Sequence, residues 1–427
     1  MAIGTGYGSQ DLKIAELFRT ADAAMQAGRL DEAAQLWGRI RSLAPNHPRA
    51  LLHLGQHQLH RGDPRGAVAL LEQAAAAEPQ NPVIPLNLSA AYRALGDGAR
   101  ELAALDRALV ADPYFFPALL AKGMYFERIG KARQAARTYK DVLTIAPAVP
   151  EDWMVKPLQR AREVVAANTA ALDAFLETRL AAARAQHEGP AGRFDECKDI
   201  LTGAKKVQAQ QPTMLHFPRL PAIPFYERGD FPWLAAVEAA TADIRGELAG
   251  LLRDDAKEFG AYVDHPDGVP LNQWAELNRS PRWSAFFLWS DGVRQDTHCA
   301  RCPKTAALLD AVPMARVPDA APAAFFSTLA PRTLIPPHTG VTNTRLIVHI
   351  PLIVPEDCWF RVGNERREWR PGEALIFDDT IEHEAWNGSD QLRAVLIFDI
   401  WNPYLSAAER DLVCDLLAGY RDFYRQD

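Results

Sequence analysis

The sequence has few cysteines and no long uncharged apolar run. Its 427 residues include only five cysteines, an odd and sparse set that argues against a disulfide framework. No stretch reaches the ~18 uncharged apolar residues that a bilayer-spanning helix needs, so we expect no membrane contact. The first residues lack a basic segment followed by an apolar run, so we expect no secretion signal and a cytoplasmic protein.

An excess of positive charge is also missing. Lys and Arg number 47 against 54 Asp and Glu, which gives a net charge of -7. Such a chain has no long-range attraction for nucleic acid or anionic lipid, so neither is expected as a partner. With 24% charged and 48% hydrophobic residues, the composition is that of a folded protein, and its length predicts two to four domains.

One cysteine pair has the spacing of a redox or metal motif. Cys299 and Cys302 form a lone CxxC, with no second pair to complete a zinc site. We therefore interpret them as reduced thiols in a loop rather than as a redox or metal centre.

Two residue types recur every 34 residues in the first part of the chain. Each recurring glycine lies 17 residues before the next recurring proline, which predicts a helix ended by Gly, a second helix, and a stop at Pro. Small and bulky positions recur with the same period, as the close packing of paired helices requires. These series are Gly28, Gly62, Gly96 and Gly130; Pro45, Pro79, Pro113 and Pro147; Ala33, Ala67 and Ala135; and Trp37, Leu71, Leu105 and Tyr139.

Residues 14–147 therefore resemble the tetratricopeptide repeats. Tyr92 and Phe126 fill the aromatic position of the first helix of a repeat, whereas the equivalent residues of the first two units do not. The resemblance implies an α-solenoid over residues 1–150 that binds a protein partner or associates with itself. A purely scaffolding role for these repeats stays open.

A connector follows the repeats. Residues 157–187 are rich in Ala, Leu and Arg and predict further helix, with a boundary near Gly189 to Gly192. Five prolines then end the helical periodicity over residues 205–232. We assign residues 151–211 to a helical connector and linker.

From about residue 324 onward the pattern changes to short β-rich runs separated by turn signals, which predicts a β-sandwich or barrel. The domain assigned to it spans residues 212–405, and an amphipathic pattern over residues 406–427 predicts a C-terminal helix packed on it. The runs are AFFSTL, TRLIVHIPLIV, CWFRV, REW, EALIFDD, HEAW and LRAVLIFDIW.

Three histidines lie in the β-rich segment. Imidazole is the commonest metal ligand in proteins, and the mouth of a β-barrel is a frequent site. His338 stands at a turn-like entry to a strand, and His383 at the start of another. The usual two-histidine iron site takes a carboxylate two residues after the first His, but position 340 is Gly. The literal His265-Pro266-Asp267 lies in a turn-rich stretch, and we expect no ligand role for it.

Alternation along two strands places polar residues on apolar faces. His349 shares one face with Arg345 and Ile347, while Leu346 and Val348 share the core face. Arg393 likewise shares a face with Val395 and Ile397. A charged residue on an apolar face needs an anion, so both faces are candidates for lining a pocket.

The order and spacing of these blocks resemble the aspartyl/asparaginyl β-hydroxylases over residues 212–405. The resemblance rests on the run HTGVTNTRL from His338, then His349, then LIFDD leading to EHEAW around His383, then Arg393 and FDIWNP. Members of this family are Fe(II)- and 2-oxoglutarate-dependent oxygenases on a double-stranded β-helix, a jelly-roll or cupin-like fold. They lack the carboxylate ligand, so Gly340 agrees with the resemblance.

The resemblance also implies roles for individual residues. His338 and His383 would be the catalytic iron ligands, with 2-oxoglutarate and O2 as cosubstrates. Arg393 would pair with the distal carboxylate of 2-oxoglutarate, because its fork of donors suits a planar acceptor. His349 and Ser327 would contact the same cosubstrate.

Three residues are implied to lie near the substrate. Arg345 would bind a substrate carboxylate, and Trp283 and Arg279 lie in the segment WAELNRSPRWSAFFLWSDG, which resembles the bacterial-type pattern. Two positions depart from the animal members: Ile347 replaces an Arg that helps to hold the cosubstrate, and Pro351 replaces a Gly.

The sequence therefore predicts an Fe(II)- and 2-oxoglutarate-dependent dioxygenase that hydroxylates the β-carbon of Asp or Asn in a peptide, a protein or an amino acid. Two alternatives stay open. One is a repeat-based interaction scaffold with a catalytically silent cupin-like domain. The other is a cupin-like metal enzyme that does not use 2-oxoglutarate.

Overall fold

The chain divides into two compact units. The computed structural model describes residues 9–186, 192–254 and 256–424, and the units are Met1–Ala204 and Lys205–Asp427. The division falls inside the segment 151–211 that the sequence predicts as connector and linker.

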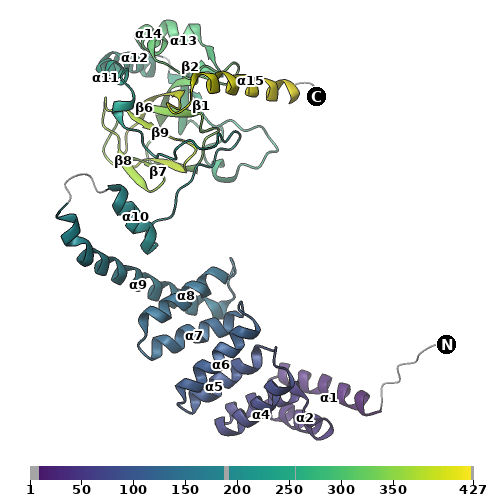
Figure 1. The fold of residues 1–427 in the computed structure, drawn as a ribbon. Helices are drawn as coiled ribbons and strands as arrows, with labels where there is room; N and C mark the ends of the chain where they lie inside the picture. The colour runs from purple at the N-terminus through teal and green to yellow at the C-terminus, as the bar shows by residue number, and fades with distance from the viewer. Residues whose placement is uncertain (1–8, 187–191, 255, 425–427) are drawn as a thin grey trace. The chain divides into compact units, whose positions relative to one another are not determined.

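Eight helices of the first unit form four consecutive hairpins (Figure 1). Each recurring proline follows the second helix of a hairpin, where the chain must leave the helix. The predicted α-solenoid of helical repeats is confirmed. The helices are α1 (Ser9–Gln26), α2 (Leu30–Leu43), α3 (Pro48–His60), α4 (Pro64–Ala77), α5 (Val83–Ala94), α6 (Gly98–Ala111), α7 (Phe116–Arg128) and α8 (Ala132–Ile145).

Glycine has two separate tasks in these hairpins. The recurring Gly28, with a φ of 71°, turns the chain between α1 and α2 in the left-handed region that other residues avoid. A second series lies inside the first helix of two hairpins, where a Cβ on Gly55 or Gly123 would overlap Leu71 or Tyr139. The small residue opposite Leu71 and opposite Tyr139 is therefore this glycine, which the sequence analysis did not single out.

Two further helices complete the first unit. The predicted helix over residues 157–187 is α9 (Asp152–Arg184), and residues 187–191, with most of the predicted boundary, lie outside the described part of the chain. Helix α10 (Gly192–Thr202) was not predicted. It is held to α9 by Lys198, whose Nζ lies 2.6 Å from an Asp173 oxygen and 2.5 Å from a Glu177 oxygen.

The second unit contains two antiparallel sheets (Figure 1). The seven-stranded sheet has the order β1-β2-β4-β11-β6-β9, with β3 paired to β2, and the four-stranded sheet has the order β5-β10-β7-β8. The strands are β1 (Gly260–Ala261), β2 (Trp283–Ser290), β3 (Val293–Arg294), β4 (Ala324–Leu329), β5 (Thr333–His338), β6 (Arg345–Ile353), β7 (Cys358–Val362), β8 (Glu365–Glu368), β9 (Leu375–Phe377), β10 (His383–Asn387) and β11 (Arg393–Trp401).

All the runs predicted as strands overlap strands of the structure, while β1, β2, β3 and β5 were not predicted. His338 ends β5 rather than beginning a strand as predicted. Pro336 and Pro337 argued against a strand at the sequence level, because proline cannot donate a backbone hydrogen bond. The structure places them in β5, which is an edge strand, where proline is tolerated.

Helices cover the outer face of the seven-stranded sheet. They are α11 (Leu234–Ala239), α12 (Thr241–Asp254), α13 (Asp296–Arg301) and α14 (Pro303–Ala311). Leu248 of α12 and Leu309 of α14 are fully buried in one core with Leu346 and Val348 of β6. The opposite face of this sheet packs against the four-stranded sheet, where Phe377 meets Phe360 with ring centroids 4.7 Å apart.

A C-terminal helix ends the described chain, as predicted. Val413 and Leu417 of α15 (Ala407–Tyr424) pack against Val317 and Ala321. The sheet-rich second unit is thus confirmed, while its finer assignment to a double-stranded β-helix stays a prediction. In the described part of the chain, none of the helices is long and apolar enough to cross a bilayer.

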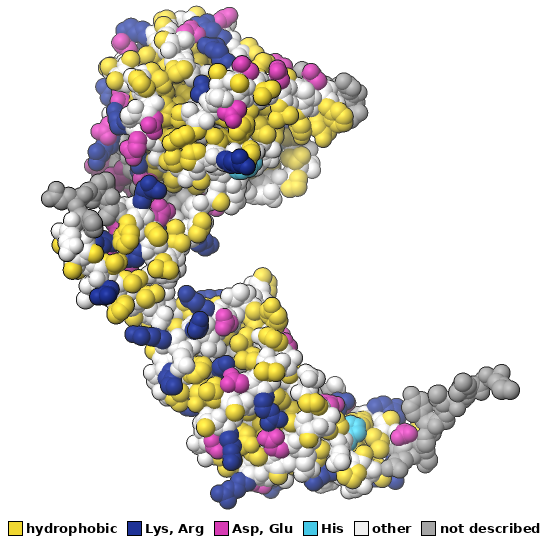
Figure 2. All heavy atoms as spheres, in the orientation of Figure 1, with side chains coloured by type: hydrophobic (Ala, Val, Ile, Leu, Met, Phe, Trp, Pro, Cys, Tyr) yellow, Lys and Arg dark blue, Asp and Glu magenta, His cyan; other side chains and the backbone are white. Residues whose placement is uncertain are grey.

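The surface carries both signs of charge. On the face that Figure 2 shows, basic and acidic side chains are interspersed over each unit. This distribution agrees with the near balance of charge in the sequence.

Candidate active site

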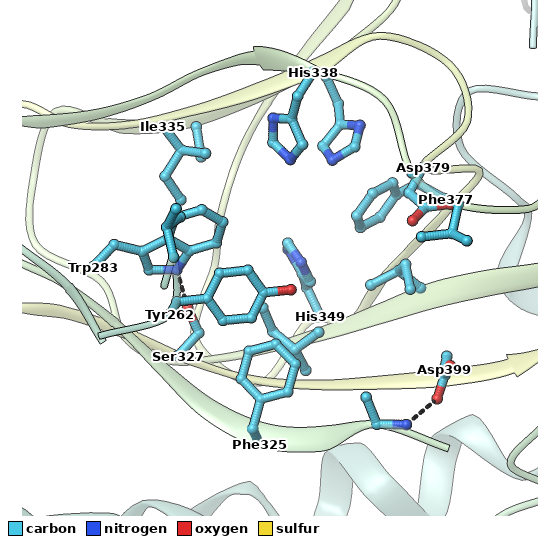
Figure 3. A pocket seen from close by; sticks show the side chains of 18 of the residues that line it. Tyr262, Trp283, Phe325, Ser327, Ile335, His338, His349, Phe377, Asp379 and Asp399 are labelled. Carbon is cyan, nitrogen blue, oxygen red and sulfur yellow. Dashed lines mark hydrogen bonds between the residues drawn. The ribbon is translucent and has the colours of Figure 1, made fainter. Parts of the chain in front are cut away.

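A pocket opens between the two sheets of the second unit. Its volume of about 440 Å³ lies in the range of small-molecule sites. Figure 3 shows His338 and His349 pointing into it, with Tyr262 and Trp283 on one side and Asp379 on the other. Seven of the eight predicted site residues line this pocket: His338, His383, His349, Arg393, Ser327, Arg345 and Trp283.

His338 and His383 face each other across neighbouring strands. They form a register pair of β5 and β10, and their ring centroids lie 4.0 Å apart. The Nδ1 atom of His338 donates to Pro336 O at 2.8 Å, and that of His383 donates to Ile381 O at 3.1 Å. Each Nε2 of the neutral ring therefore carries a lone pair, which is the group that binds a metal ion.

The burial of the pair keeps the rings neutral. Burial lowers the pKa of His383 well below its usual value, and the nearby His338 adds to the effect. The pKa of His338 is also lowered by burial. A neutral imidazole is the form that binds metal. Among the described residues, no group of three or more His, Cys, Asp or Glu could hold a metal ion, so the pair has no third protein ligand of these types.

Asp379 is a site residue that the sequence analysis missed. A Cβ on residue 340 would overlap its carboxylate, so the glycine two positions after His338 leaves the room that this carboxylate takes. Gly340 N also donates to Asp379 O at 2.7 Å. Burial raises the pKa of Asp379 to about 7, and Asp378 adds to the shift.

Arg393 is a buried cation for which the described residues supply no carboxylate counter-ion. Its side chain is 1% exposed, and its Nε and Nη1 have no hydrogen-bond partner among the described residues. Burial lowers the pKa of its guanidinium to about 10. His349 lies in the same pocket, and its buried Nδ1 likewise lacks a partner in the described structure. Such unpartnered donors are costly unless an anion binds them.

Aromatic rings hold the Arg393 guanidinium in place. The guanidinium carbon lies 4.2 Å from the centroid of Trp369, which stacks on Phe360. A cation over an indole face is favourable, although it leaves the in-plane N–H donors unused. The guanidinium is therefore oriented before any ligand binds.

Ser327 and Trp283 form a hydrogen-bonded pair on the wall of the pocket. Trp283 Nε1 donates to Ser327 Oγ at 3.1 Å, and both side chains are buried (Figure 3). The serine hydroxyl keeps its own hydrogen for a second partner. Trp283 also stacks on Tyr262, with ring centroids 4.1 Å apart.

Arg345 is paired with a carboxylate that the sequence analysis missed. Arg345 Nη1 donates to Asp399, whose other oxygen accepts from Ala323 N at 2.8 Å. Asp399 lies on the pocket side of β11 with Arg393 and Ile397. The alternation that placed Arg393 could have found it, because residues 393, 397 and 399 share one face.

Arg279 is not among the residues that line the pocket, and its place beside a substrate stays a prediction. It lies on the surface with a φ of 53°, and it pairs with Asp264 at 2.7 Å and Asp267 at 2.8 Å. Its backbone N donates to Val263 O at 2.8 Å. Since Val263 and Asp264 line the pocket, Arg279 supports a loop at the rim.

The CxxC cysteines belong to the core and not to a loop as predicted, since Cys299 lies in α13 and Cys302 directly follows that helix. Cys299 and Cys302 are buried among the helices that cover the seven-stranded sheet. Burial raises the pKa of Cys302 to about 12, so the thiol stays protonated and unreactive.

Comparison with known families assigns both units. Residues 238–403 match the family model described as Aspartyl/Asparaginyl beta-hydroxylase. This part of the chain is similar to the aspartyl/asparaginyl beta-hydroxylase family. Residues 18–82 and 59–114 match the Tetratricopeptide repeat. The segment that precedes residue 238 in the second unit lies outside the hydroxylase match.

Curated relatives share the hydroxylase domain. The human aspartyl/asparaginyl beta-hydroxylase is 34% identical over 183 residues, which are 42% of this chain and 24% of that protein. The Rhizobium tropici ornithine lipid ester-linked acyl 2-hydroxylase is 35% identical over 197 residues, 45% of this chain and 66% of that protein. The chain thus spans about a quarter of the human relative and less than two thirds of several others.

Solved structures resemble the repeats. A protein of Thermus thermophilus described as a thermophilic TPR protein is 25% identical and covers 40% of this chain and 98% of its own, with a TM-score of 0.31.

Proposed function

We propose that this protein is an Fe(II)- and 2-oxoglutarate-dependent dioxygenase that hydroxylates the β-carbon of an Asp or Asn residue. The observation that carries the proposal is the buried guanidinium of Arg393, two of whose nitrogens lack a partner among the described residues, in the same pocket as two histidines that donate through Nδ1 and so keep a lone pair on Nε2. A buried cation in the same pocket as two histidines that can bind a metal ion suits a cosubstrate that is an anion and that also binds the metal.

The residues present fit the iron ion. His338 and His383 would hold it through Nε2, with the remaining positions left to the cosubstrate, O2 and water. Bound iron and 2-oxoglutarate would supply the oxidising chemistry, which converts 2-oxoglutarate to succinate and CO2 while the substrate gains a hydroxyl group.

The residues also fit 2-oxoglutarate. The Nε and Nη1 donors of Arg393 would bind its distal carboxylate, which fills the unmet hydrogen bonds of the buried guanidinium. The unpartnered Nδ1 of His349 and the hydroxyl of Ser327 would add two further contacts. Because Ile347 carries no charge, Arg393 would neutralise the cosubstrate without the second arginine of the animal members.

The Arg345–Asp399 pair favours a polar substrate. It stands in the pocket beside the metal pair, and it offers donors from the guanidinium and acceptors from the carboxylate. An Asp or Asn side chain and its flanking backbone present the matching groups, which an acyl chain lacks. We therefore propose a peptide, protein or amino-acid substrate rather than a lipid acyl chain.

The helical repeats would recruit a protein, either the substrate or a partner. Repeats of this kind form extended surfaces for peptides and subunits. This role is separate from the chemistry of the pocket.

Product analysis tests the proposal. Purified protein is incubated under air with Fe(II), ascorbate, 2-oxoglutarate and peptides that contain Asp or Asn, beside matched peptides with Ala at those positions. We expect mass spectrometry to find one added oxygen on Asp or Asn only, and only when 2-oxoglutarate is present. Addition to an acyl chain alone would contradict the substrate assignment, and the absence of both 2-oxoglutarate turnover and binding would favour the silent scaffold.

A further inference from the structure

An irregular segment at the start of the second unit lies against the loops that carry the two histidines. We call residues 208–217 the strap; it has no helix or regular strand, and it follows the helical unit in the chain. It also precedes the part of the chain that matches the hydroxylase family. The sequence analysis placed most of its first half in a linker, but its hydrogen bonds join it to the β-sheet domain.

The strap touches both ligand loops. The first ligand loop, residues 339–344, follows His338; the second, residues 378–382, precedes His383. On the first loop, Thr213 N donates to Gly340 O at 2.9 Å, and Leu215 N donates to Val341 O at 3.1 Å. On the second, Gln211 N donates to Thr380 O at 2.7 Å.

Gln210 is the side chain that joins the two loops through the strap. Its Nε2 donates to Asp378 Oδ2 at 2.5 Å, and its Oε1 accepts from Asn343 Nδ2 at 3.0 Å. One amide therefore spans from the second ligand loop to the first. Both of its partners, Asp378 and Asn343, are fully buried, while Gln210 itself is half-buried.

The partners of Gln210 are themselves held in place. Asn343 Nδ2 also donates to Phe217 O at 2.9 Å, and its Oδ1 accepts from Phe217 N at 2.7 Å. The other oxygen of Asp378 accepts from Thr380 Oγ1 at 2.6 Å and from Thr380 N at 3.0 Å. Removal of the Gln210 amide would leave a buried donor and a buried carboxylate oxygen without this partner.

We propose that Gln210 is a positioning residue for the two-histidine site: by joining the loops beside the His338–His383 strand pair, it holds the two imidazoles in one arrangement. The inference rests on the proposed function. The two histidines pair through β5 and β10, and the described residues offer no third ligand of the usual kinds, so the arrangement of the rings depends on this pairing and on the two loops. The strap supplies this restraint from outside the matched hydroxylase domain.

The test measures metal binding and fold separately in the full chain. Co(II) serves as the probe, titrated by its visible absorption without 2-oxoglutarate, and thermal unfolding is recorded for the metal-free protein. The variants are Gln210→Ala and Gln210→Glu; the latter keeps the length and the acceptor but cannot donate to Asp378. The matched control is Gln208→Ala, on the same strap, whose amide donates instead to Asn364 Oδ1 at 3.3 Å, outside both loops.

We expect both Gln210 variants to bind Co(II) about tenfold more weakly than the wild type, with an altered spectrum, as loss of outer-shell partners usually causes. Gln208→Ala should bind as the wild type does, and its Tm should fall less than that of the Gln210 variants, because it loses a single hydrogen bond of 3.3 Å. Every variant must be folded at the temperature of the titration. Wild-type affinity in Gln210→Ala or in Gln210→Glu would overturn the positioning role and leave the proposed function standing. Absence of Co(II) binding by the wild type would overturn both.

Discussion

At the scale of single residues, the site is defined by polar groups that have no hydrogen-bond partner in the described part of the protein. Arg393 carries a charge on a buried side chain, and two of its nitrogens have no hydrogen-bond partner among the described residues. Folding has placed this cation at a cost, which binding of an anion would offset. The resemblance predicted its role, but only the structure shows that the donors are free.

Replacement of Arg393 by Met tests this account. Arg393→Met keeps an apolar stem and removes the buried charge, so the ligand-free protein should unfold at the same or a higher temperature. In the wild type, 2-oxoglutarate at 100 times its Kd should add about 2.7 kcal/mol of stability, and the variant should lose this gain. Thermal unfolding with a metal ion present measures both. Arg332→Met, at an exposed arginine, is the control, and an undiminished gain in Arg393→Met would contradict the assignment.

Gly340 packs against Asp379, which lies 39 residues later in the chain. Its contact with Asp379 arises from the pairing of β5 with β10, which no local pattern reveals. The sequence could show that position 340 is Gly and not an acidic residue. For the same reason, it could not show that the Asp379 carboxylate lies beside this glycine.

A double-mutant cycle tests this contact. Gly340→Ala should lower the free energy of unfolding by about 1–3 kcal/mol, because its Cβ overlaps the Asp379 carboxylate. Adding Asp379→Ala should remove most of this loss, with a coupling of about 0.5–3 kcal/mol. Urea unfolding measures each variant beside Gly260→Ala, where a Cβ meets nothing within 4 Å. Additive effects of the two substitutions would show that the residues do not touch.

At the scale of elements, glycines inside the helices differ in how closely a neighbouring helix packs against them, and the sequence alone does not show this difference. The 34-residue period predicted the hairpins because each repeat has the same turn and stop residues. It did not show that Gly123 of α7 and Tyr139 of α8 share one contact, since that depends on how the two helices face each other.

Two substitutions of Gly by Ala should therefore have opposite signs. Gly123→Ala should destabilise the helical unit by about 1–3 kcal/mol, because its Cβ would overlap the Tyr139 ring. Gly38→Ala, inside α2 with open space around the new Cβ, should stabilise it by about 0.5–1 kcal/mol. Chemical denaturation followed by helical circular dichroism measures both. A loss of stability in Gly38→Ala equal to that in Gly123→Ala would refute the packing argument.

At the scale of the whole molecule, two sequence patterns produce two units. The helical period and the alternating β-runs were visible because each repeats regularly. The strap escaped prediction because a proline-rich, aperiodic segment carries no such signal, and its hydrogen bonds reach residues more than 120 positions away. The site therefore depends on a segment that a family match over residues 238–403 does not contain.

The central claim is that the two histidines support turnover of 2-oxoglutarate. The most direct measurement is succinate formation by purified protein with Fe(II), ascorbate and 2-oxoglutarate under air, compared with His383→Ala and with the surface control His60→Ala, at an exposed histidine of α3. We predict succinate from the wild type and from His60→Ala, and only background from His383→Ala with its fold intact. No succinate from the wild type, or an equal amount from His383→Ala, would contradict the account.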